Sequence, residues 1–155
     1  MWQVHEMRPG VYIFMDLVMH TVGVCAIEDI ALSVLTTVIG HQPDKGWVLV
    51  DAGWLAMSRD KGMPSAKKSY GYGLVCAMDG VPVGDLSFDS ANQEHGILKG
   101  VEGVEGRMLQ EKYPVGTLLR ILPNHACATA AAFSEYHILD SKGFIQGTWS
   151  RINGW

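Results

Sequence analysis

Short apolar runs alternate with turn-forming residues along the whole sequence. Runs rich in β-branched and aromatic residues predict strands. Such runs cover residues 11–15, 30–39, 47–50, 74–78, 81–86, 117–122, 137–139 and 144–149, and a further apolar piece begins at residue 97. The pattern leaves two segments open: residues 54–57 fit a helical turn or a short strand, and residues 104–113 fit a short helix or a strand with a loop.

Turn signals place hairpins between some of these runs. Asp79-Gly80 separates two of them, and glycine adopts the positive φ of a tight hairpin turn at little cost. A last hairpin is expected across residues 140–143. Parallel strands would need helical crossovers of about a dozen residues, and the runs are too closely spaced for these. We therefore expect one mainly β domain over residues 1–155, an antiparallel barrel or sandwich with minor helix.

Composition and charge exclude several classes of protein. The 155 residues are 48% hydrophobic and 18% charged, which excludes a disordered chain and a coiled coil. The net charge is −4 and the Lys and Arg residues are scattered, so no basic stripe for nucleic-acid binding exists. The most apolar region, residues 11–40, is interrupted by Asp16, His20, Glu28 and Asp29, so we expect no membrane span.

The cysteine pattern bears on the cellular compartment. Cys25, Cys76 and Cys127 are odd in number and widely spaced, which favours a reducing compartment over a disulfide framework. The first residues contain no basic segment that leads into an apolar one, so no secretory signal is expected. We expect a cytoplasmic protein.

The segment from Leu122 to Thr129 carries the strongest candidate chemistry. In an extended backbone, His125 and Cys127 would face the same side, about 6.5–7 Å apart at Cα. An imidazole and a thiolate are both ligands that zinc accepts, and two protein ligands leave positions open for catalysis. The alternative is that the pair is fortuitous and the cysteine is an inert core residue.

Two further acidic positions are candidates. Glu94 precedes His95, and a carboxylate beside an imidazole can orient it or tune its pKa; a plain surface turn ending in Gly96 is the alternative. Asp51 follows an apolar run, where it either caps a helix or faces a cleft, and capping is favoured. Phosphate-loop, dinucleotide-binding, Gly-x-Ser-x-Gly and His-Glu-x-x-His motifs are absent.

Taken in order, several segments resemble the C-terminal domain of a known family. They are Arg8-Pro9-Gly10 with residues 11–16, residues 31–39, 50–53 and 56–60, Gln93-Glu94-His95-Gly96, Leu122 to Thr129, and the terminal Gly154-Trp155. Together they are similar to the D-serine dehydratase and D-threonine aldolase family, the fold-type III pyridoxal-phosphate enzymes related to alanine racemase. The resemblance implies an alanine racemase-like, antiparallel β-barrel-like C-terminal domain.

The resemblance also implies site residues and cofactors. In the family this β domain supplies a divalent-metal site to a TIM barrel that carries the pyridoxal-phosphate lysine. Carried over by position, the ligands are His125 and Cys127, and the cysteine version resembles the zinc-using D-serine dehydratase branch. Glu94 and His95 match another family signature and are candidate active-site neighbours. A metal there acts as a Lewis acid on the substrate hydroxyl.

One departure from the family is large. A TIM barrel needs about 250 residues, and this sequence holds none. We therefore expect a stand-alone or excised domain for lyase chemistry on D-β-hydroxy amino acids, inactive alone, with pyridoxal phosphate bound only when a separately encoded barrel is its partner. The alternative is a non-catalytic binding or oligomerisation module. A homo-oligomer is expected, because the missing parts would leave a sheet edge or an apolar face uncovered.

Overall fold

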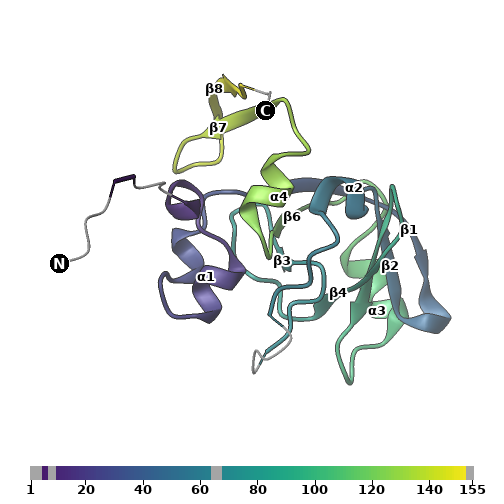
Figure 1. Ribbon diagram of the computed structural model, residues 1–155. Coiled ribbons are helices and arrows are strands. Elements are labelled where there is room, and N and C mark those ends of the chain that lie inside the picture. Colours follow the sequence, from purple (N-terminus) through teal and green to yellow (C-terminus); the bar gives the residue numbers. More distant parts are fainter. Residues whose placement is uncertain (1–4, 7–9, 64–67, 153–155) are drawn as a thin grey trace.

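A computed structural model describes residues 5–6, 10–63 and 68–152, and its centre is a six-stranded antiparallel sheet (Figure 1). Arg8, Pro9, Gly154 and Trp155 lie outside the described residues. The strand order is β3-β6-β1-β2-β5-β4. The strands are β1 (Val34–Gln42), β2 (Trp47–Val50), β3 (Leu74–Cys76), β4 (Leu86–Ala91), β5 (Gly96–Gly100) and β6 (Leu118–Leu122).

The two edges of this sheet approach each other, so that it forms a nearly closed barrel. Tyr72 N donates to Phe88 O at 3.0 Å, and Val83 N donates to Val75 O at 3.1 Å. Gly71 lies at this seam with φ +58°, and a Cβ there would collide with the carbonyl oxygen of Phe88. Only glycine therefore allows this approach of the two edges. The expectation of a mainly β, barrel-like fold is confirmed.

The barrel interior is filled by the inward-facing residues of the strands. Burial alternates along β1 and β2, as a half-buried strand requires. Phe88 is fully buried, and its ring lies 5.5 Å from that of Tyr72. Among the fully buried strand residues of the core are Val38, Val48, Val50, Phe88, Leu98 and Ile121. This core fixes the strand ends from which the loops and helices project.

Short helices surround the barrel. The α-helices are α1 (Leu17–Thr21), α2 (Trp54–Met57), α3 (Gly106–Lys112) and α4 (Ala126–Ala130), and the 3-10 helices are Val11–Ile13, Ile27–Asp29 and Pro43–Lys45. Figure 1 shows α2 and α4 along the upper side of the barrel, below the β7–β8 hairpin, and α3 lower, beside β4. Thr129 Oγ1 donates to Met57 O at 2.8 Å, which joins α4 to α2. In the described part of the chain, no helix is long and apolar enough to span a bilayer.

One polar cluster ties α3 to the loop before β4. Asp85 accepts hydrogen bonds from Lys112 Nζ at 2.7 Å and from Tyr113 Oη at 2.6 Å. Burial alone raises the pKa of Asp85, but these two hydrogen bonds outweigh it and hold the pKa below its usual value. The cluster therefore prefers the ionised carboxylate.

The C-terminal hairpin lies outside the barrel, at the top of Figure 1. Its strands are β7 (Glu135–Leu139) and β8 (Ile145–Ser150), which pair only with each other. The sequence predicted this hairpin, and it is confirmed. Tyr136 attaches it to the body, with its ring 5.6 Å from that of Phe14 and its hydroxyl donating to Ala130 O at 3.0 Å.

Two predicted strands are wrong. Residues 11–15 form a 3-10 turn, in which Phe14 N and Met15 N both donate to Val11 O. Met15 has φ +51°, a conformation that no strand contains. The turn at Asp79-Gly80 forms as expected, but residues 81–85 form no continuous strand. They make an isolated bridge at Pro82, whose nitrogen cannot donate to a ladder, and the separate bond from Val83 N to Val75 O. Residues 54–57 and 104–113 are resolved in favour of helix.

Candidate functional site

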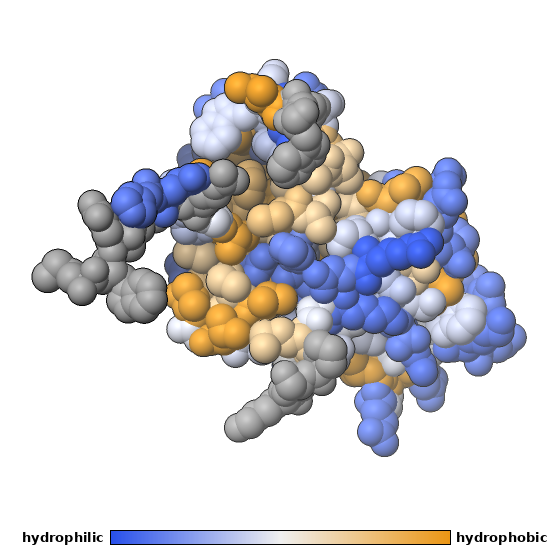
Figure 2. Space-filling view, in the orientation of Figure 1, coloured by the Kyte–Doolittle hydropathy of each residue, from blue (hydrophilic) through white to orange (hydrophobic). Residues whose placement is uncertain are grey.

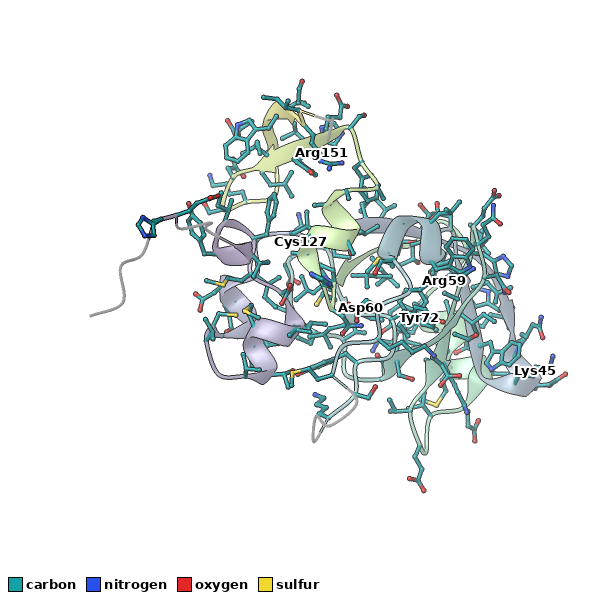
Figure 3. The ribbon with its side chains drawn as sticks, viewed as in Figure 1. Lys45, Arg59, Asp60, Tyr72, Cys127 and Arg151 are labelled. Carbon is teal, nitrogen blue, oxygen red and sulfur yellow. The ribbon has the colours of Figure 1, made fainter. Side chains whose placement is uncertain are left out.

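His125 and Cys127 lie where β6 passes into α4. His125 is the N-cap residue of α4, with φ −132° and ψ 101°, and Cys127 lies in the first helical turn. The expected extended backbone therefore stops at His125, because the helix begins at Ala126. Both side chains are exposed, and Figure 3 shows Cys127 on α4. The two candidate ligands thus share the exposed N-terminal end of one short helix.

The residues just before His125 are fixed by backbone hydrogen bonds from α1. Leu17 N donates to Pro123 O at 3.1 Å, and Val18 N donates to Asn124 O at 3.2 Å. These donors are the free N–H groups at the start of a helix, which have no partner within α1. The start of α1 therefore pairs with the segment that leads into the candidate ligands.

A buried carboxylate completes this attachment. Asp16 is 1% exposed, and its Oδ2 accepts a hydrogen bond from Ala126 N at 2.9 Å. Its Oδ1 accepts from Met19 N at 2.9 Å and so caps α1. One side chain therefore stabilises the start of α1 and fixes the residue between His125 and Cys127.

Asp60 is a functional candidate that the sequence analysis missed. Its Oδ2 lies 3.0 Å from His125 Nδ1, and its Oδ1 accepts a hydrogen bond from Gly62 N at 2.7 Å. Asn124 Nδ2 donates to Asp60 O at 3.0 Å and to Gly71 O at 2.8 Å. Figure 3 shows Asp60 beside the N-terminal end of α4. Asp60 lies in the segment 56–60 that carried part of the family resemblance, but nothing in the sequence linked it to His125.

Glu94 and His95 lie in the turn between β4 and β5. Glu94 is exposed, and His95 Nε2 lies 2.8 Å from Asn92 Nδ2, within the same turn. Asn92 N donates to His95 O at 2.9 Å, which closes the turn. These two hydrogen bonds of His95 stay within its turn, and they link it neither to His125 nor to Cys127.

This turn has a clear structural role at the start of α2. Trp54 N and Leu55 N donate to the carbonyls of Asn92 and Gln93, at 2.9 and 3.1 Å. A Cβ on Gly53 would collide with Gln93 O, so glycine is needed for this close approach. The turn that contains Glu94 and His95 therefore supplies the acceptors for the free N–H groups of α2.

Asp51 does not cap α2, contrary to the favoured interpretation. The N-cap residue is Gly53, which has no side chain to accept a hydrogen bond. Asp51 Oδ1 instead accepts from Thr36 Oγ1 at 2.7 Å and from Thr37 N at 2.8 Å. Asp51 therefore bridges β2 to β1.

The three cysteines differ in accessibility. Cys76 is fully buried, and desolvation, with the nearby charge of Asp79, raises its pKa to about 11. Burial also raises the pKa of the half-buried Cys25, and the charge of Asp29 adds to this effect. Cys127 is exposed. It is therefore the thiol of the three that is most accessible to an external ion.

The donor set of the site fits zinc in kind but not in number. Imidazole nitrogen and thiolate sulfur are both typical zinc ligands. Within residues 5–6, 10–63 and 68–152, no group of three or more His, Cys, Asp or Glu side chains could hold a metal ion together. His125 and Cys127 could thus supply two ligands, and the remaining positions would be filled from outside the described residues.

Sequence comparison identifies relatives of this chain. A family described as "Putative serine dehydratase domain" matches residues 31–139. The D-threo-3-hydroxyaspartate dehydratase of Delftia sp. is 55% identical over 152 residues, which are 98% of this chain and 40% of that protein. The D-serine dehydratase of Dictyostelium discoideum is 32% identical and is matched over 38% of its length. The chain therefore spans about 40% of the length of these two relatives.

Structural comparison also identifies the Delftia dehydratase. Structures of the Delftia dehydratase match with a TM-score of 0.86 over 94% of this chain and 37–38% of theirs. One is a histidine-to-alanine variant, and another is a metal-free variant with alanine in place of a cysteine two positions further along. An alanine racemase-like protein from Idiomarina loihiensis, 48% identical, matches with a TM-score of 0.85 over 94% of this chain and 38% of its own. With the family matched over residues 31–139, this chain is a member of the serine dehydratase domain family.

Proposed function

We propose that this chain supplies the metal-binding part of a pyridoxal-phosphate-dependent lyase that acts on D-β-hydroxy amino acids. His125 and Cys127 are the ligands, and zinc is the divalent cation that this donor pair favours. One observation carries the proposal: an exposed histidine and an exposed cysteine stand two positions apart at the start of α4. The alanine variants of the Delftia dehydratase alter the same two residue types at the same spacing.

The chain's own residues hold and present the two ligands. Asp16 fixes the backbone between them, and Asn124 joins the segment to the neighbouring loop. When bound, a divalent cation supplies Lewis-acid polarisation of the substrate hydroxyl. Glu94 and His95 remain candidate active-site neighbours. Their turn lies at the start of α2, whereas α4 contacts the end of α2.

Pyridoxal phosphate does not fit the described residues, so no catalytic step is assigned to it. A Schiff-base lysine must be free to reach a cofactor in a pocket. Instead, all six lysines of the described residues are exposed. Lys45, Lys61, Lys68 and Lys112 each lie over an aromatic ring, and Lys99 and Lys142 lie on the surface as well. We therefore assign the cofactor to a separate barrel partner. All three cysteines are free, which is consistent with the cytoplasmic location we propose.

Metal binding by the purified chain tests this proposal. Zinc stoichiometry after dialysis, and the sulfur-to-metal charge-transfer band of a cobalt-substituted sample, should both be lost in His125→Ala and in Cys127→Ala. Cys25→Ala is the matched control, because it removes another thiol and leaves the site intact. We also expect no pyruvate from D-serine when pyridoxal phosphate and zinc are added to the chain alone. Pyruvate release would contradict the need for a partner.

The second candidate function is a non-catalytic association module, and exposed apolar residues favour it. Phe144, Ile145 and Trp149 of the C-terminal hairpin are at least 60% exposed. Figure 2 shows hydrophobic residues gathered over α1, where Val22 and Val24 are exposed. Either surface would suit a homo-oligomer. A folded, metal-free chain that is indifferent to both ligand substitutions and that self-associates in light scattering would favour this function.

A further inference from the structure

We propose that Asp60 is a positioning residue for His125: its carboxylate accepts the Nδ1 proton and so presents the Nε2 lone pair to the metal ion. This inference rests on the proposed function. The distance of 3.0 Å from Asp60 Oδ2 to His125 Nδ1 is that of a hydrogen bond. An ionised carboxylate only accepts, so the proton of this bond belongs to Nδ1. In a neutral imidazole, Nε2 is then the nitrogen that can bind a cation.

The position of Asp60 is itself fixed. Its Oδ1 accepts from Gly62 N at 2.7 Å, and its backbone N donates to Ser58 Oγ at 3.2 Å. Its carbonyl oxygen accepts from Nδ2 of Asn124, the residue before His125, at 3.0 Å. Because Asn124 is 3% exposed, this bond is well shielded from water. The side chain of Asn124 therefore fixes the position of Asp60 relative to His125.

A turn-forming role alone does not account for Asp60. The bond from Gly62 N to Oδ1 makes a side-chain turn, and Asp79 makes the same turn with Val81 N at 3.0 Å. The turn needs only one carboxylate oxygen. The second oxygen of Asp60 is directed at His125, which lies 65 positions away in the sequence. Asp60 therefore has one interaction that its local turn does not require.

Stability does not account for the pair either. The side chain of His125 is 47% exposed and that of Asp60 is 36% exposed. Ion pairs with this much exposure contribute about 0–1 kcal/mol to folding. What the pair determines is the direction and tautomer of the ring. A carboxylate or carbonyl that accepts the other ring N–H is the usual support of a metal-binding histidine.

The test compares Asp60→Ala with Asp79→Ala, since each substitution removes the same kind of turn. Zinc affinity, measured by competition with a chelating dye, should fall by about 10–100-fold in Asp60→Ala and stay unchanged in Asp79→Ala. Asp60→Asn keeps the turn acceptor, so its zinc affinity should lie between those of Asp60→Ala and the wild type. In the metal-free chain, the ¹⁵N shifts of the His125 ring should report a protonated Nδ1, and Asp60→Ala should move them toward the other tautomer.

The outcomes separate the two proposals. Zinc affinity that His125→Ala abolishes and Asp60→Ala leaves unchanged would overturn the role of Asp60 alone. A wild-type chain without zinc affinity would overturn the proposed function and, with it, the positioning role. Unchanged ¹⁵N shifts in Asp60→Ala would also overturn the role of Asp60, whatever the zinc result.

Discussion

Replacing Asp16 with alanine tests whether one buried carboxylate holds in place the segment that contains His125 and Cys127. Asp16 is 1% exposed and accepts hydrogen bonds from Met19 N and Ala126 N, each at 2.9 Å. Alanine accepts neither. The substitution therefore removes the cap of α1 and the acceptor at the start of α4 in one step, while the side chains of His125 and Cys127 stay intact.

The size of the loss follows from these two bonds. Removing an N-cap aspartate costs about 0.5–2 kcal/mol. Removing a charged acceptor from the buried N–H of Ala126 costs about 1.5–3 kcal/mol. Asp16→Ala should therefore lower the free energy of unfolding by about 2–5 kcal/mol. That is a large part of the stability of a domain of this size, which is about 5–15 kcal/mol.

Urea denaturation followed by circular dichroism measures this effect. Asp29→Ala is the matched control, because Asp29 also accepts a backbone bond, from Ala26 N at 2.8 Å, but is exposed. We expect the control to lose less than about 1 kcal/mol. The slope of free energy against urea should be unchanged in both variants. Equal losses in the two variants would refute the claim that burial of Asp16 makes its bonds important.

Three further predictions concern other parts of the molecule. Gly71→Ala should destabilise by about 2–5 kcal/mol, since it adds a clash to a positive φ, whereas Gly80→Ala, with open space around it, should lose about 1–2 kcal/mol in the same urea assay. The wild type should be more stable than Asp85→Asn at pH 7. This difference should shrink as the pH falls through the lowered pKa of Asp85, because protonation ends the advantage of the ionised form. A difference that does not depend on pH in acid denaturation would contradict this. At pH 8, Cys127 should react with a disulfide reagent while Cys76, buried and with a pKa of about 11, stays protected, and a Cys127→Ser variant that keeps the fast phase would disprove the assignment.

The strands were the most predictable part of the fold. β2 occupies Trp47–Val50 as the apolar run indicates, because strong β propensity and burial coincide there. Residues 11–15 have the same propensity, but they form a turn whose Phe14 packs against Tyr136 of the C-terminal hairpin. That contact joins residues 122 positions apart, so no local pattern could reveal it. Propensity failed where a distant partner decided the conformation.

The residues of the candidate site also differ in whether the sequence could predict them. His125 and Cys127 are two positions apart, so their residue types and spacing, together with the family resemblance, were enough to single them out. Asp60 lies 65 positions from His125, and Asp16 lies 110 positions from Ala126. A lone aspartate has many ordinary roles, and only the folded chain shows which one it has. The supporting residues therefore had to come from the structure.

The proposed ligands and the buried residues that hold their segment also differ in burial, which separates function from stability in this site. The side chains of His125 and Cys127 are exposed, whereas Asp16 and Asn124 are 1% and 3% exposed. Exposed side chains contribute little to folding, and buried polar groups cannot lose their partners cheaply. Substitutions of His125 or Cys127 should thus remove metal and leave a folded chain, whereas substitutions of Asp16 or Asn124 should weaken the fold itself. An exposed pair of proposed ligands on a buried support is the arrangement expected of a site whose remaining ligands come from outside the described residues.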